Sequence, residues 1–154
     1  MTKVTDAYLS QKRPVVLCDF SPPRNADPEF VDRVADVPAD FISVAYNPGR
    51  LARADSSSVA HVIQQRLGRE AVFTLSPRDM NKIALQSQLL GASMIGLQNV
   101  ILLGGDNLTE RETLQGVRQV RDLTPTALIS AVRAMNAGAD YRGAPLQGTT
   151  DFCI

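Results

Sequence analysis

The sequence predicts an α/β fold of the (β/α)8-barrel (TIM-barrel) type, in which about the first five strands are present. Three observations lead to this prediction. Short apolar runs alternate with amphipathic helical patterns along the chain. The first units repeat about every 30 residues, as βαβ units do. Polar turns follow the carboxyl end of each of the first four runs.

The predicted strands are continuous apolar runs rather than alternating ones. Such runs are typical of parallel strands that are covered on both faces. Strands separated by helices are joined by right-handed crossovers, which makes the sheet parallel. The predicted strands are 14–20, 41–46, 71–75, 99–103 and 151–154.

Helical periodicity fills the segments between the strands. We predict helices over 27–37 and 55–67, a third that opens at Ser76-Pro77, and a fourth that opens at Thr124-Pro125 and ends near Gly138. The expected core faces are Phe30, Val31, Val34 and Val37; Val59, Val62, Ile63 and Leu67; Met80, Ile83, Ala84, Leu90 and Met94; and Leu128, Ile129, Val132 and Met135.

The turns after the strands favour a barrel over a doubly wound sheet. A dinucleotide-binding sheet would carry G-x-G-x-x-G after its first strand, but Ser21-Pro22-Pro23-Arg24 stands there instead. Similar irregular turns follow the next strands at 47–50, 76–79 and 104–107. Barrel enzymes place their sites at these carboxyl ends.

Length and charge exclude several classes of protein. The 154 residues fit a single domain, 1–154, and 16 basic residues balance 16 acidic ones. We therefore expect no nucleic-acid or membrane partner. The amino terminus lacks a signal-peptide pattern, and no apolar run approaches the ~20 residues of a membrane span. We expect a soluble, cytoplasmic protein.

The cysteines and the histidine point to no special chemistry. Cys18 and Cys153 lie in apolar runs, so we expect reduced thiols rather than a disulfide. His61 is the only histidine and has no neighbouring ligands in the sequence. We therefore predict no metal site.

Four strand-end motifs resemble the methylenetetrahydrofolate reductase family in order and spacing. They are Asp19-Phe20-Ser21-Pro22-Pro23-Arg24, Ser43-Val44-Ala45-Tyr46-Asn47-Pro48-Gly49, Leu75-Ser76-Pro77-Arg78-Asp79 and Leu103-Gly104-Gly105-Asp106. The resemblance covers nearly the whole chain. It implies a barrel that holds FAD at the carboxyl ends of its strands and passes a hydride from NAD(P)H through the flavin to 5,10-methylenetetrahydrofolate, giving 5-methyltetrahydrofolate.

The same resemblance assigns roles to individual residues. Asp19 stands where the family usually has a glutamate acid, one methylene longer, and would be the catalytic acid; the alternative is a carboxylate that caps a backbone amide. Asp106 matches an aspartate beside the flavin and the folate ring. The cofactor-binding residues implied are Ala45, Tyr46, Thr74, Leu103, Gly104, Gly105 and Asp106.

Several of these positions depart from the family pattern. Ala45 and Thr74 stand where the family commonly has threonine and histidine, and Gly104 stands where it often has a larger residue, sometimes arginine. Tyr46 keeps an aromatic residue. Arg24, Arg50 and Arg78 lie on the presumed active face, as phosphate-binding candidates or as solvated surface arginines.

A full barrel takes about 250 residues and eight strands. We therefore expect either a longer parent chain, which we favour, or a homo-oligomer or partner subunit that covers the open barrel.

Two other functions stand beside the reductase. The main alternative function is a non-catalytic half-barrel that binds flavin, pterin or folate or assembles with a partner. A lyase or aldolase is less favoured, because no lysine stands at a predicted strand end.

Overall fold

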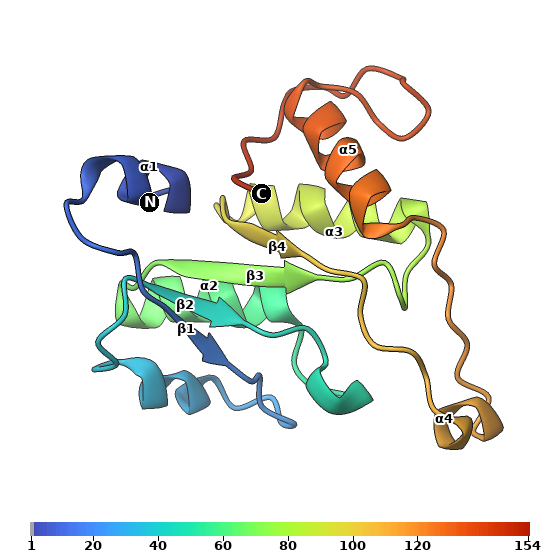
Figure 1. The fold of residues 1–154 in the computed structure, drawn as a ribbon, viewed down its shortest axis with the longest axis horizontal. Coiled ribbons are helices and arrows are strands. Elements are labelled where there is room, and N and C mark those ends of the chain that lie inside the picture. The colour runs from blue at the N-terminus through green and yellow to red at the C-terminus, as the bar shows by residue number, and fades with distance from the viewer. Residues whose placement is uncertain (1) are drawn as a thin grey trace.

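The computed structural model describes residues 2–154. Four strands alternate with helices along the chain (Figure 1). The elements are α1 (Val4–Ser10), β1 (Leu17–Phe20), η1 (Pro28–Val34), β2 (Phe41–Val44), η2 (Pro48–Arg50), α2 (Ser56–Leu67), β3 (Ala71–Leu75), α3 (Lys82–Met94), β4 (Val100–Leu102), α4 (Glu110–Leu114) and α5 (Pro125–Asn136), where η marks a 3₁₀-helix.

The strands form one parallel sheet in the order β1-β2-β3-β4. A doubly wound sheet reverses its strand order partway across; this sheet does not, so its order is consistent with part of a barrel. The predicted fifth strand is reduced to a single parallel bridge between Asn99 and Cys153. There the Val100 N–H donates to the Cys153 carbonyl at 3.0 Å, and the Cys153 N–H donates to the Gln98 carbonyl at 2.7 Å.

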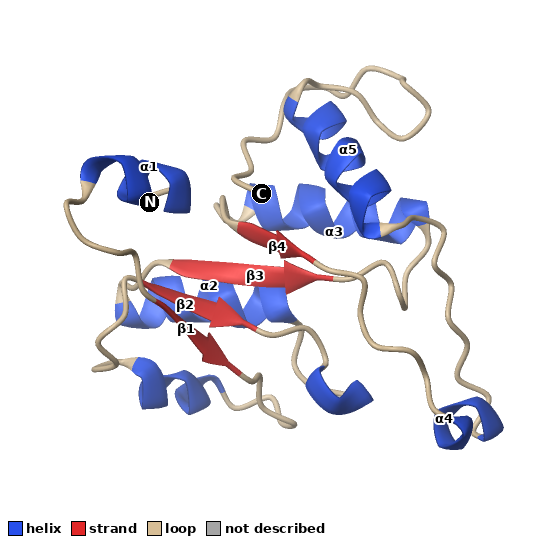
Figure 2. Ribbon diagram, in the orientation of Figure 1, coloured by secondary structure: helices blue, strands red, loops and turns tan. Residues whose placement is uncertain are grey.

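The two faces of the sheet are covered differently. One face packs against η1, α2, α3 and α5, two of which lie behind the strands in Figure 2. Ile42, Val44, Phe73 and Leu75 are buried there. Because side chains alternate along a strand, the residues between them point to the opposite face, and that face carries the functional site described below.

Helix α1 covers the amino-terminal end of this second face. Ala7 packs with Phe41 and Val72 in a small separate core. The buried Asn99 side chain holds the segment in place, because its Oδ1 accepts from the Val4 N–H and its Nδ2 donates to the Thr2 carbonyl, both at 2.9 Å. The amino end is thereby filled, whereas the carboxyl end stays open.

Two of the predicted helices form, and each is capped at its start. In α2, Asp55 accepts from the Ser58 N–H and Gly68 ends the helix at a φ of +62°. In α5, Thr124 accepts from the Ala127 N–H, with Pro125 at the first position. The segment predicted as a helix over 27–37 forms the shorter 3₁₀-helix η1 instead.

The prediction for α3 was wrong at its start and on its face. Asn81, not Ser76, caps the helix by accepting from the Ala84 N–H. The buried face is Leu85, Gln86, Leu89 and Ala92, whereas Ile83, Leu90 and Met94 are exposed. The helix starts later than predicted because the 76–79 turn is held by a distant segment. The Pro77 carbonyl accepts from the Arg121 N–H, and the Arg78 carbonyl accepts from the Val120 N–H.

Candidate functional site

A cavity of about 620 Å³ lies at the carboxyl end of the sheet. All of the residues predicted for the site line it, and they come from all four strands and the turns after them. These are Asp19, Ala45, Tyr46, Thr74, Leu103, Gly104, Gly105 and Asp106. A volume of this size is typical of small-molecule and cofactor sites.

Strand register explains why these side chains converge. Asp19 pairs with Ser43 across β1 and β2, and Thr74 pairs with Ile101 across β3 and β4. Paired residues in adjacent parallel strands point to the same face. All four line the cavity. Thr74 and Ser43 are buried, whereas Asp19 is exposed at its rim.

The turn after β4 lies directly against the turn after β3. Gly105 has a φ of +70°, and a Cβ there would lie 2.5 Å from Ser76 Oγ and 3.2 Å from Arg78 Cβ. Arg121 ties down the same turn, since its Nη2 donates to the Gly105 carbonyl at 3.2 Å. Only glycine allows this approach, which brings the end of β4 beside Arg78.

Arg78 is the cation of the cavity wall. It is only 4% exposed, and its Nε and Nη2 donate to the two carboxylate oxygens of Asp79, both at 2.7 Å. These bonds raise the pKa of Arg78, so it is charged at every working pH. Its guanidinium carbon lies 6.0 Å from the ring centre of Tyr46.

Tyr46 is a neutral hydrogen-bonding group in this setting. Burial, together with the nearby Asp79 carboxylate, raises the pKa of Tyr46 to about 12. Tyr46 therefore keeps its phenolic proton at neutral pH. Beside a bound ligand it can donate or accept a hydrogen bond.

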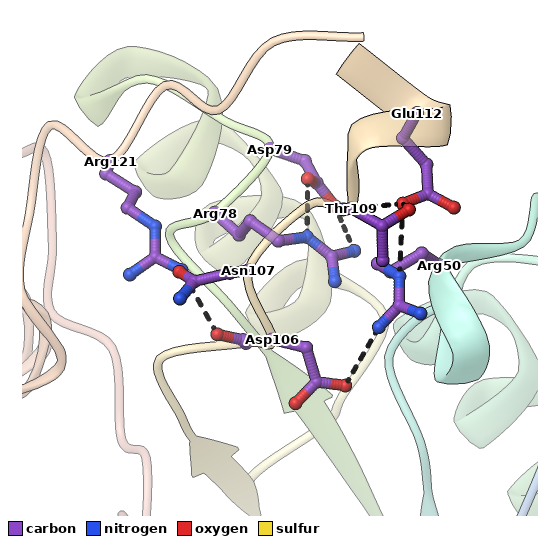
Figure 3. Close-up of polar contacts among 9 residues, drawn as sticks. Arg50, Arg78, Asp79, Asp106, Asn107, Thr109, Glu112 and Arg121 are labelled. Atoms are coloured by element: carbon purple, nitrogen blue, oxygen red, sulfur yellow. Dashed lines mark hydrogen bonds and ion pairs between the residues drawn. The ribbon is translucent and has the colours of Figure 1, made fainter. Parts of the chain in front are cut away.

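A second ionic contact links the turn after β2 to α4. Arg50 Nη1 lies 3.8 Å from Asp106 Oδ2, and Arg50 Nε lies 3.3 Å from Glu112 Oε2 (Figure 3). Glu112 also closes a capping box with Thr109, and bonds from Thr109, with Arg50 nearby, hold the pKa of Glu112 below its ordinary value. The first part of the loop over 107–122 is therefore tied to the turn after β2.

The three candidate arginines have different positions. Arg78 lines the cavity, Arg50 lines a smaller hollow beside it, and the exposed Arg24 lines neither. Asp19 is exposed, and within residues 2–154 no backbone N–H donates to its carboxylate, as the amide-capping alternative would require.

Sequence reasoning missed part of the cavity wall. Ser43, Asn47, Pro48 and Ile101 also line it. The signal for Ser43 and Ile101 was available, because each stands two residues before a predicted site residue on the same strand and so shares its face. Gly104 presents no side chain to this space: a Cβ there would lie 3.3 Å from Pro125 Cγ, at the start of α5.

Residues 2–154 contain neither a candidate metal site nor a helix that could span a membrane. No group of three His, Cys, Asp or Glu side chains in this range is placed to hold a metal ion. None of the helices in the same range has the length and apolar character needed to cross a bilayer.

Comparison with known families decides the relationship that the motifs suggested. The family model described as methylenetetrahydrofolate reductase matches residues 4–142 of the 154. The chain belongs to the methylenetetrahydrofolate reductase family. Its predicted family is thereby confirmed. No curated protein matches the chain.

Membership of the methylenetetrahydrofolate reductase family supplies a cofactor against which the cavity can be tested. Enzymes of this family typically use FAD and NAD(P)H. A flavin ring offers a flat apolar surface with a polar, oxygen-bearing edge. Ala45, Ile101 and Leu103 provide apolar wall, and Thr74 and Arg78 provide buried hydrogen-bonding groups. The residues present therefore fit such a ring.

Proposed function

We propose that this protein is an FAD-dependent oxidoreductase that reduces 5,10-methylenetetrahydrofolate to 5-methyltetrahydrofolate with NAD(P)H, or a part of such an enzyme. One observation carries the proposal. In a chain of the methylenetetrahydrofolate reductase family, residues from four separate strand ends line one cavity of about 620 Å³.

The fold proposed for the whole enzyme is the (β/α)8 barrel. The sequential order of the four parallel strands supports it, and so does the position of the cavity at their carboxyl ends. The cytoplasmic location expected from the sequence stays a prediction.

The protein's own residues would act as follows. FAD, when bound, would accept a hydride and pass it on. Tyr46, Thr74 and the backbone of 103–105 would hold and orient the cofactor. Asp19, on the rim, would present a proton to the folate as its five-membered ring opens. General acid catalysis requires that this carboxyl group reach the nitrogen that accepts the proton. Asp106, on the adjacent turn, would contact both ligands.

The direct test is titration of the purified chain with FAD, followed by absorbance near the flavin maxima and by quenching of flavin fluorescence. Saturable binding followed by bleaching with NADH or NADPH would support the proposal. Reoxidation by 5,10-methylenetetrahydrofolate would identify the acceptor. A chain that is folded by circular dichroism and binds no flavin would contradict it.

The second candidate function is a non-catalytic half-barrel that binds a flavin, pterin or folate, or that joins a copy of itself or a partner subunit. Two observations favour it. Asp19 is exposed and has the shorter carboxylate arm, and β1 is an edge strand with Leu17 also exposed. Flavin binding without bleaching by either nicotinamide, together with a dimer mass in light scattering, would select it.

A further inference from the structure

Arg78 has more hydrogen-bond donors than the surrounding protein uses. A guanidinium has five N–H groups, and two of those on Arg78 are directed to Asp79. Within residues 2–154, this guanidinium makes no other hydrogen bond. In Figure 3 it lies between Asp79 on one side and Asp106 on the other.

The rest of the cavity wall makes this donor group distinctive. Asp19 and Asp106 also line the cavity and are acidic, and Arg78 is the one lysine or arginine among its lining residues within the described chain. Arg78 is therefore the cationic side chain of this wall that can attract an anionic ligand oxygen.

Other nearby arginines are already committed to protein groups. Arg50 is paired with Asp106 and Glu112. Arg121 donates to the Gly105 carbonyl and to Asn107 Oδ1. Arg78 differs because the bidentate pair with Asp79 holds its plane rigidly while leaving one nitrogen, Nη1, without a partner.

We propose that Arg78 is the anchor that binds an anionic or carbonyl oxygen of the ligand in this cavity. A planar guanidinium with two fixed bonds loses little further entropy when it binds such an oxygen. The proposal rests on the proposed function for the identity of the ligand, a flavin, whose phosphates and ring edge both carry oxygens of this kind.

The test compares the full chain with Arg78→Gln and Arg78→Lys, using FAD, FMN and riboflavin as probes. Arg24→Gln is the matched control, because it removes the same charge from an exposed residue outside the cavity. We expect Arg78→Gln to raise the flavin Kd by about tenfold or more, Arg78→Lys by less, and Arg24→Gln by under about twofold. Thermal melting by circular dichroism checks that each variant is folded.

The three flavins distinguish the source of the oxygen. Weaker binding of FAD and FMN, with riboflavin unaffected, assigns Arg78 to a phosphate; equal weakening of all three assigns it to the ring. Either result supports the anchor. Unchanged Kd values for all three flavins in a folded Arg78→Gln variant would overturn it.

Failure of the proposed function would give a different result, in which the unaltered chain binds no flavin at all. Inorganic pyrophosphate is then the probe, and the side-chain nitrogen resonances of Arg78 in ¹⁵N-labelled unaltered chain are the readout. Saturable shifts at Arg78 would keep the anchor. Resonances that do not move would reject it, even if both variants failed to fold.

Discussion

Gly105 approaches Ser76 so closely that a single methyl group on it would lie 2.5 Å from the serine Oγ. This contact brings the turn after β4 against the turn after β3, where the Ser76 Oγ also accepts from the Arg78 N–H at 3.2 Å. The cavity wall therefore depends on a position where the absence of a side chain is required.

Gly105→Ala should destabilise the fold and distort the cavity. The positive φ costs about 1–2 kcal/mol for a residue with a Cβ, and the clash with Ser76 adds about 1–3 kcal/mol. Gly116→Ala is the matched control, because Gly116 has a φ of +81° and nothing within 4 Å of the added atom. Urea unfolding should show a clearly larger loss for Gly105→Ala, and equal losses would mean that the contact with Ser76 is not tight.

Tyr46 should ionise late. Its pKa of about 12 lies above the ordinary tyrosine value near 10. The folded state therefore holds a proton that the unfolded state has lost, so the stability contributed by the neutral side chain is complete below about pH 10 and declines as the pH rises toward 12. Absorbance at 295 nm, read milliseconds after a pH jump, should show a step near pH 12 that Tyr46→Phe lacks. If the step that Tyr46→Phe loses lies near pH 10 instead, the burial argument is refuted.

Asp40 should titrate unusually low. Arg13 donates to both of its oxygens, and the Val16 N–H donates to Oδ2, so the pKa of Asp40 falls to about 2. A lowered pKa stabilises the fold above the unfolded value of 3.8, and that stability is lost as the pH falls toward 2. Carboxyl ¹³C shifts measured against pH should place the Asp40 midpoint near 2. Arg13→Gln should raise that midpoint, and an unmoved midpoint would show that Arg13 is not the cause.

Glu112 should hold α4 through two separable contacts. Glu112→Gln keeps a residue able to close the capping box with Thr109 but loses the ion pair with Arg50, whereas Glu112→Ala loses both. Amide hydrogen exchange over 107–122 should be faster in Glu112→Gln than in the unaltered chain and fastest in Glu112→Ala. If Glu112→Gln exchanges like the unaltered chain, the ion pair between Glu112 and Arg50 contributes nothing to this loop.

Asp19 should separate the two halves of the proposed reaction. Asp19→Asn removes the acid and should slow flavin reoxidation by 5,10-methylenetetrahydrofolate by about 10²–10⁴-fold, while flavin reduction by NAD(P)H stays within about twofold. Asp19→Glu restores the family's longer arm and should reoxidise at least as fast as the unaltered chain. Stopped-flow absorbance measures both steps, and equal slowing of both steps in Asp19→Asn would remove Asp19 from the acid role.

Local patterns in the sequence determined most of the elements. Continuous apolar runs identified β1 to β4, helical periodicity identified α2, and Thr124-Pro125 identified the start of α5. The carboxyl ends of these apolar runs also marked the strand ends that meet at the cavity. These features depend on neighbours within a few positions of the chain, so the sequence contains them directly.

Only the tertiary structure decided which residues meet around the site. Ser76-Pro77 has the local form of a helix start, but its turn is held by N–H groups of Val120 and Arg121, more than 40 residues away, and α3 starts later. The close fit of Gly105 against Ser76 and Arg78 also depends on how two turns pack. Such contacts arise between distant segments whose approach no local periodicity encodes, and they set the charge and shape of the cavity.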